Sequence, residues 1–303
     1  MPKSFSGSSS LDNAIAGFSA GAISTIFLHP LDLVKTRFQI DDTVKGLNGK
    51  RLGATFNTLK TIFVKNKFIG LYRGMSPSFV GSTLSWGIYF YWYDLIKRKK
   101  ANGDRLTKLT AIQHLTSSAE AGLITALITN PLWVVKTRMC ASNRSDPGAY
   151  KGLIDGLYQI IKYEGFFGFY KGIIPSLLST SHGAIQFMIY EEMKKWRLKI
   201  TPDKDRERLD NFEYLLMSGS SKAFASITTY PYQVIRTRLQ NQKNEMKYLG
   251  VFDIMKKILR NEGILGFYKG LAPNILRVLP GTCTTFLVYE NVNEFFKEHA
   301  RYD

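Results

Sequence analysis

The chain has 303 residues, with 41 Lys and Arg against 24 Asp and Glu and a formal net charge of +17. This charge favours an anionic partner, which could be nucleic acid, an anionic lipid or an anionic substrate. Cys140 and Cys283 have neither CxxC nor metal-ligand spacing, so we expect no disulfide scaffold and no metal site. The first ten residues lack the apolar core of a signal peptide, and no cleavable signal is expected.

In chain order, the first apolar stretch predicts a helix over 12–40 that contains the motif HPLDLVKTRFQ. A turn, GLYRG, then introduces a second predicted helix over 75–97. Between them, TFNTLKTIF predicts a short amphipathic helix at 55–63. The same order recurs twice, with long helices predicted at 111–142, 173–196, 212–243 and 272–296 and a second short one at 152–163.

The recurrence is regular enough to define three repeats. Pro30, Pro131 and Pro231 are spaced by 101 and 100 residues, in HPLDLVKTRFQ, NPLWVVKTRM and YPYQVIRTRLQ. The turns GLYRG, GFYKG and GFYKG follow each motif in the same order. We therefore expect three repeats, at 1–105, 106–205 and 206–303, each with two long helices.

The distribution of charge decides between a membrane protein and a soluble helical repeat. Stretches of about 20 apolar residues fit a bilayer, and most basic residues lie in the tails and polar connections. A basic helical-repeat protein that binds nucleic acid would instead carry charge along exposed helix faces. The pattern predicts an all-α membrane protein with six transmembrane helices.

The pattern Pro-x-acid-x-x-base-x-base, followed by acid-Gly and aromatic-base-Gly, resembles the mitochondrial carrier family. Pro30, Asp32, Lys35 and Arg37 match it, whereas Asn66-Lys67 stands in place of acid-Gly in the first repeat. The resemblance implies six helices with pseudo-threefold symmetry around a central cavity, and a short matrix-side helix in each repeat. It also implies a monomeric, multi-pass transporter of the mitochondrial inner membrane, in contact with lipid such as cardiolipin, which works by alternating access between two gates.

Two departures narrow the group within this family. Trp133 and Gln233 occupy slots where an acid is expected, and the run SHGAIQFMIYEEMK follows in the fourth helix. These features resemble the folate and flavin adenine dinucleotide (FAD) carriers, which makes FAD or folate the expected transported substrate. An NAD or pyrimidine-nucleotide carrier remains an alternative. No catalytic constellation or P-loop is visible, so neither enzymatic activity nor a catalytic cofactor is expected.

The resemblance also assigns two gates, because in this family an acid on one helix pairs with a base on another. For the matrix gate it implies contacts of Asp32 with Lys136, Trp133 with Arg236 and Gln233 with Lys35. For the cytoplasmic gate it implies contacts of Asp94 with Lys194, Glu290 with Lys97 and Glu191 with Asn293. Trp133 could alternatively be an anchor at the membrane interface.

Between the gates, charged residues are costly and are usually functional. Lys222 and Arg277 lie deep in predicted helices, and we expect them to bind a phosphate or carboxylate. Glu120 is expected to pair with Lys222 when the cavity is empty, with a purely structural ion pair as the alternative. Stacking on Trp86 and Tyr89 and hydrogen bonds from His182 and Gln186 complete the expected substrate site, although ordinary packing explains these four residues almost as well.

Overall fold

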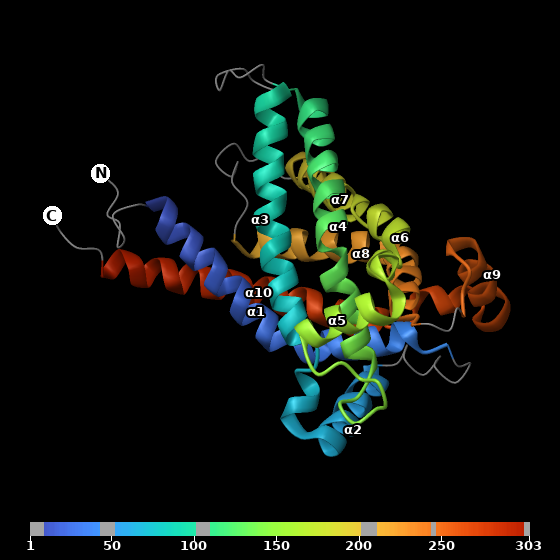
Figure 1. Cartoon of the computed structure of the whole chain (residues 1–303). Coiled ribbons are helices and arrows are strands. Elements are labelled where there is room, and N and C mark those ends of the chain that lie inside the picture. The colour runs from blue at the N-terminus through green and yellow to red at the C-terminus, as the bar shows by residue number, and fades with distance from the viewer. Residues whose placement is uncertain (1–8, 43–51, 101–109, 201–210, 244–246, 300–303) are drawn as a thin grey trace.

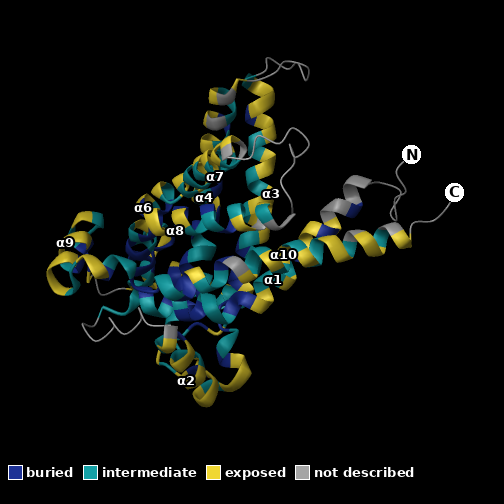
Figure 2. Cartoon of the chain, turned by 180° about the vertical axis from the view of Figure 1, so that it is seen from behind, coloured by how far each residue is buried: buried dark blue, intermediate teal, exposed yellow. Residues whose placement is uncertain are grey.

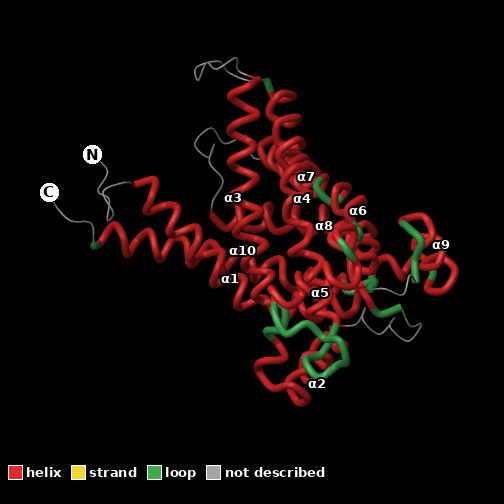
Figure 3. The backbone as a smooth tube through the Cα atoms, viewed as in Figure 1, coloured by secondary structure: helices red, strands yellow, loops and turns green. Residues whose placement is uncertain are grey.

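The computed structural model describes residues 9–42, 52–100, 110–200, 211–243 and 247–299, and these residues form no strand (Figure 3). The long helices are α1 Ser9–Ile40, α3 Met75–Lys100, α4 Ala111–Ala141, α7 Ser181–Ile200, α8 Asn211–Asn241 and α10 Leu271–Glu298. The shorter ones are α2 Leu52–Leu71, α5 Leu153–Glu164, α6 Ile173–Leu178 and α9 Val251–Glu262, with 3-10 turns η2 Phe166–Tyr170 and η3 Ile264–Tyr268. The all-α fold class is confirmed.

The long helices pack in pairs that join neighbouring repeats. α1 packs against α10, α3 against α4, and α7 against α8. In Figure 1, the α1–α10 pair and the α3–α4 pair point in different directions from a common region. In that region α1, α4 and α8 contact one another. We call it the closed end, formed by the proline motifs at 29–39, 130–140 and 230–240.

The outer surface of the helices is rich in apolar side chains, as a bilayer requires. Phe27, Trp86 and Phe187 are all more than half exposed, and exposed segments follow the helices in Figure 2. Among the described residues, the stretches Ile15–Ile40 and Ile112–Ala141 are both long and apolar enough to cross a membrane. The remaining long helices fall below that criterion because Ser, Thr and charged residues dilute them.

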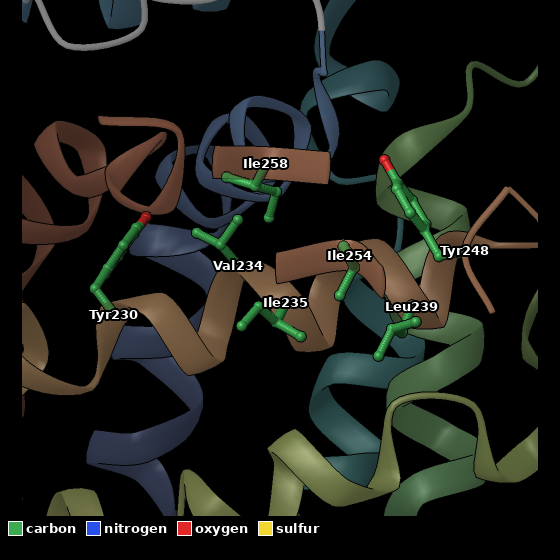
Figure 4. Packing of buried hydrophobic residues seen from close by; sticks show 7 residues of the cluster. All are labelled: Tyr230, Val234, Ile235, Leu239, Tyr248, Ile254 and Ile258. Carbon is green, nitrogen blue, oxygen red and sulfur yellow. The ribbon is translucent and has the colours of Figure 1, made fainter. Parts of the chain in front are cut away.

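The short helices cover the closed end. In the third repeat, Ile254 and Ile258 of α9 are one turn apart and pack on Val234 and Ile235 of α8 (Figure 4). All four side chains are at most 2% exposed. Burial of an aliphatic side chain stabilises by about 1.5–3 kcal/mol, so this contact fixes α9 against the proline-motif half of α8.

The helix predicted over 173–196 is wrong as a continuous element, because it is divided into α6 and α7. Ser179, Thr180 and Ser181 each donate a side-chain hydrogen bond to a backbone carbonyl three or four residues earlier, at 2.7 Å. Hydroxyls that bond to local carbonyls compete with regular helix formation. Three consecutive hydroxyl residues therefore interrupt the helix directly before His182.

Candidate functional site

Two of the three expected matrix-gate contacts are present at the closed end. Lys35 Nζ donates to Gln233 Oε1 at 3.0 Å, which joins α1 to α8. The Arg236 guanidinium carbon lies 5.8 Å from the centre of the Trp133 ring, which joins α8 to α4. Lys136 Nζ lies 5.0 Å from the same ring. Trp133 therefore contacts two cations, and these distances are within the range of a cation–π interaction.

The third expected contact is wrong in this structure. Asp32 forms an ion pair with Arg277 of α10 rather than with Lys136. Arg277 lies on α10, the second long helix of the third repeat. Its long side chain reaches Asp32 from the side of the cavity that both residues line. The gate acid and the expected anion-binding residue thus neutralise each other.

Backbone carbonyls at the closed end are bound in a cyclic order. The last arginine of each proline motif donates to a carbonyl near the end of the next proline-motif helix: Arg37 Nε to Cys140 O at 3.1 Å, Arg138 Nε to Gln240 O at 2.9 Å, and Arg238 Nε to Gln39 O at 2.8 Å. The last carbonyls of a helix have no intrahelical partner. These arginines satisfy them while joining α1, α4 and α8 in a ring.

Two buried carboxylates reinforce the ring from the short helices. Glu164, the last residue of α5, accepts hydrogen bonds from Arg138 at 2.5 and 2.9 Å and from Lys171 at 2.6 Å. Burial acts to raise the pKa of Glu164, but the hydrogen bonds and charges of Arg138 and Lys171 outweigh it and lower the pKa below its ordinary value. Glu262 is held in the same way by Arg238 and Lys269.

A polar cavity of about 260 Å³ lies directly beside the closed end. It brings together Lys222, Arg277 and His182, which were predicted for the substrate site, with Lys35 and Gln233, which were predicted for the matrix gate. Asp32, Ser24, Thr25, Ser226, Asn274 and Thr285 add further polar groups. His182 Nδ1 is hydrogen-bonded to Thr229 Oγ1 at 3.2 Å. The helix interruption before His182 therefore lies at the edge of this cavity.

The charge of the cavity suits an anion. Lys35, Lys222 and Arg277 line it, and Asp32 is the only carboxylate among its lining residues. In the described part of the chain, Lys222 forms no ion pair. A phosphate or carboxylate would find one point charge at Lys222 and a planar guanidinium at Arg277.

The expected pairing of Glu120 with Lys222 is wrong. Glu120 pairs with Lys100 at 2.8 Å, and its side chain is 50% exposed. It borders a different, largely apolar groove between α3 and α4, together with Trp92, Leu95 and Lys99. One face of α4 therefore carries Glu120 away from the central cavity.

The remaining predicted substrate residues do not line the central cavity. Tyr89 is hydrogen-bonded to Ser118 at 2.7 Å and stacks on Tyr93, while Trp86 stacks on Phe90 at 5.6 Å. Gln186, one turn beyond His182, is also absent from its lining. Ser226 and Asn274 line the cavity but were not predicted, because nothing in a single Ser or Asn distinguishes a cavity position from a packed one.

Two of the expected cytoplasmic-gate pairs, Asp94 with Lys194 and Glu290 with Lys97, are not formed among the described residues. Asp94 pairs with Arg98, one turn away on α3, at 2.6 Å. Across the described residues, neither Lys194 nor Lys97 has an ion-pair partner, and Glu290 is exposed. The side chain of Asn293, the expected partner of Glu191, lies outside the described residues. In Figure 1 the α1–α10 pair and the α3–α4 pair diverge toward this end, which agrees with the missing contacts.

Comparison with known proteins identifies the family. The model of the mitochondrial carrier protein family matches residues 6–103, 107–200 and 207–300. The chain belongs to the mitochondrial carrier family. Folate transporter 1, chloroplastic, of Arabidopsis thaliana is 40% identical, with 95% of this chain and 96% of the relative covered. The mitochondrial FAD carrier protein FLX1 of Saccharomyces cerevisiae is 34% identical over 92% of this carrier and 94% of its own length. Nicotinamide adenine dinucleotide transporter 2, mitochondrial, of Arabidopsis thaliana is 39% identical over 94% of this carrier and 80% of its own length.

Proposed function

We propose that this carrier moves an anionic cofactor with an aromatic ring system across the mitochondrial inner membrane by alternating access, with FAD as the first candidate and folate as the second. The observation that carries this proposal is the cavity beside the gate, in which three cations face one carboxylate. Relatives named for folate and FAD transport support the choice of substrate.

The ion pair between Asp32 and Arg277 suggests how binding reaches the gate. A phosphate or carboxylate of the substrate competes with Asp32 for the Arg277 guanidinium, because both acceptors need the same donors. Asp32 is then released toward the other cations of the closed end. Lys222 holds the substrate's charge from α8 meanwhile, so binding and rearrangement of the gate occur at adjoining residues.

NAD is the alternative substrate, after FAD and folate. The relative named as an NAD transporter is nearly as similar as the folate transporter. NAD also carries a pyrophosphate and aromatic rings, so the same two cations would bind it. The relatives differ in the compartment that their names give, and mitochondrial localisation remains part of the proposal.

Uptake by liposomes containing the purified protein tests this function. We expect accumulation of FAD or folate above that of NAD and pyrimidine nucleotides when all are compared in parallel. Arg277→Lys should lower affinity about tenfold or more through loss of a charge-assisted hydrogen bond, whereas Lys222→Arg should retain uptake. Transport restricted to dicarboxylates or inorganic ions would refute the proposal.

A further inference from the structure

The later two repeats bury a carboxylate between two cations, and the first repeat keeps the cations but lacks the acid. The side chains of Glu164 and Glu262 are only 5% and 3% exposed. Each forms ion pairs with one arginine and one lysine. Arg37 and Arg73 hold the corresponding motif positions in the first repeat. Asn66 stands where the glutamate is found in the other repeats.

The local backbone around Asn66 is like that around the two glutamates. In all three repeats a glycine four residues later packs directly on this residue. A Cβ atom added to Gly70 would lie 2.3 Å from the Cβ of Asn66. The same addition would place a Cβ on Gly168 2.8 Å from that of Glu164, and one on Gly266 2.7 Å from that of Glu262. The side chain of Asn66 therefore starts from the position from which a glutamate reaches its two cations.

A neutral oxygen from another repeat takes the place of the missing carboxylate. Asn143 Oδ1 accepts hydrogen bonds from Arg37 Nη2 at 2.9 Å and from Asn66 Nδ2 at 3.3 Å. Asp146 is close by, but its carboxylate is bound to the backbone N–H of Asn143 at 2.6 Å. Among the residues the structure describes, Asp146 forms no ion pair. Within the described part of the chain, neither Arg37 nor Arg73 therefore has a direct carboxylate partner.

Arg73 has an unused donor in this cluster. Its residue is 9% exposed, and its Nη2 donates to Ser142 Oγ at 3.1 Å and Tyr150 O at 3.2 Å. Its Nε is buried and has no hydrogen-bond partner in the described structure. A buried donor without an acceptor is costly, and more so on a charged group. The cluster thus contains a free donor and excess positive charge.

We propose that Arg37, Asn66 and Arg73 form a binding site for a small oxyanion of the phosphate or carboxylate type, which supplies the acceptor oxygens that Glu164 and Glu262 supply in the other repeats. The anion replaces Asn143 Oδ1 as the acceptor of the hydrogen bonds from Arg37 and Asn66. It also accepts a hydrogen bond from the Nε of Arg73. Because Arg37 also binds Cys140 O at the end of α4, anion binding stabilises the contact between α1 and α4 at the closed end. This site is separate from the central cavity and does not depend on which substrate is carried.

Thermal unfolding of the full-length protein in detergent tests the site, with inorganic phosphate as the probe and chloride as the reference at matched ionic strength. We expect phosphate to give a saturable rise in Tm of roughly 2–4 °C. Asn66→Glu should raise Tm in chloride and abolish the phosphate response, since the chain then provides its own carboxylate. Arg73→Gln should also abolish the response, without the rise in chloride.

Two control variants separate this site from general charge effects and from the cavity. Lys60→Gln removes one charge from an exposed position of α2, the helix that carries Asn66. This variant should leave the phosphate response intact. Arg277→Ala should leave it intact too, because Arg277 belongs to the cavity. No response in the unmodified protein, a response that persists in either Asn66→Glu or Arg73→Gln, or its loss in Lys60→Gln or Arg277→Ala would overturn the proposal.

A further arm identifies the source of the phosphate group. Micelles containing an anionic phospholipid are compared with phosphate-free micelles of a neutral lipid. A rise in Tm with the anionic lipid that disappears in Asn66→Glu would assign the site to a lipid headgroup. A rise with free phosphate alone would assign it to a soluble anion. A rise with the lipid that Asn66→Glu retains would place lipid binding elsewhere and count against this site.

Discussion

Lys67 has a backbone conformation that L-amino acids rarely adopt. Its φ and ψ are 52° and −156°, and it is the one non-glycine residue with positive φ in the described chain. The corresponding residues of the other repeats are Gly165 at 69° and −170° and Gly263 at 68° and −173°. This region is accessible almost only to glycine and costs other residues on the order of 1–3 kcal/mol.

Lys67→Gly should therefore stabilise the protein. Relief of backbone strain outweighs the entropy that glycine loses on folding, about 0.5–1 kcal/mol, and leaves a net gain of roughly 1 kcal/mol. Thermal unfolding would show a higher Tm. Lys65→Gly removes the same side chain from a regular, exposed position of α2 and should lower the Tm. A fall in Tm for Lys67→Gly would show that the turn does not store strain.

Gln233→Glu should strengthen the closed end, because it converts the hydrogen bond from Lys35 into an ion pair without changing side-chain size. An ion pair near water contributes about 0.5–1 kcal/mol. We expect a higher Tm and roughly two- to fivefold slower uptake into liposomes, since opening must now break the pair. Equal Tm and equal uptake rate would show that this contact remains intact during transport.

At the scale of elements, the division between α6 and α7 gives the fourth membrane segment a different structure from α3 and α10. The amide of His182 bonds to Ser179 O at 3.2 Å and that of Thr180 to Leu177 O at 3.1 Å, so the interruption has three-residue spacing. Such a segment within a helix is a common site of bending. It lies beside the cavity through His182, where bending would change the position of a lining residue.

Replacement of Ser179, Thr180 and Ser181 together by alanine should produce a continuous helix from α6 to α7. Alanine removes the competing hydroxyls and has the highest helix propensity. Hydrogen exchange measured by mass spectrometry should slow at these residues, and uptake should fall because the bend is lost. Alanine at Thr282 and Thr284 of the unbroken α10, neither of which lines the cavity, controls for loss of hydroxyls. Unchanged exchange in the first variant would show that the interruption has another cause.

At the scale of the whole molecule, three glycines allow the helix pairs to close around the proline motifs. Gly74, Gly172 and Gly270 have φ of 81°, 74° and 84°. A Cβ on Gly172 would lie 3.0 Å from Arg236 O, and one on Gly270 would lie 2.8 Å from Lys35 O. Each turn thus touches the backbone of a proline-motif helix in the following repeat.

Gly172→Ala should favour opening of the closed end. A left-handed conformation costs alanine roughly 1–2 kcal/mol, and the new methyl group also presses on Arg236 O. In a Cys283→Ser background, maleimide labelling of the fully buried Cys140 should become several-fold faster. Gly122→Ala, where an added Cβ meets nothing within 4 Å, should leave the labelling rate unchanged. Equal labelling of Cys140 in both variants would contradict this role.

The sequence by itself determined the threefold order, the family and the long helices other than the interrupted fourth, because each depends on spacing along the chain. It also predicted the contacts of Lys35 with Gln233 and of Trp133 with Arg236. These partners lie on successive proline-motif helices, so the cyclic order of the repeats already brings them together. The cavity positions of Lys222, Arg277 and His182 were likewise predicted. A polar side chain deep in an apolar helix is costly when it faces lipid, so it faces the interior of the protein.

Only the tertiary structure decided which charges meet. Asp32 contacts Arg277 rather than Lys136, and Glu120 contacts Lys100 rather than Lys222. Both outcomes depend on how far a long side chain reaches from a neighbouring helix and on how each helix is rotated, and repeat spacing specifies neither. The missing carboxylate beside Arg37 and Arg73 also became evident only in space, because the sequence does not show that Arg73 is buried or that Arg37 bonds to a neutral Asn143 oxygen.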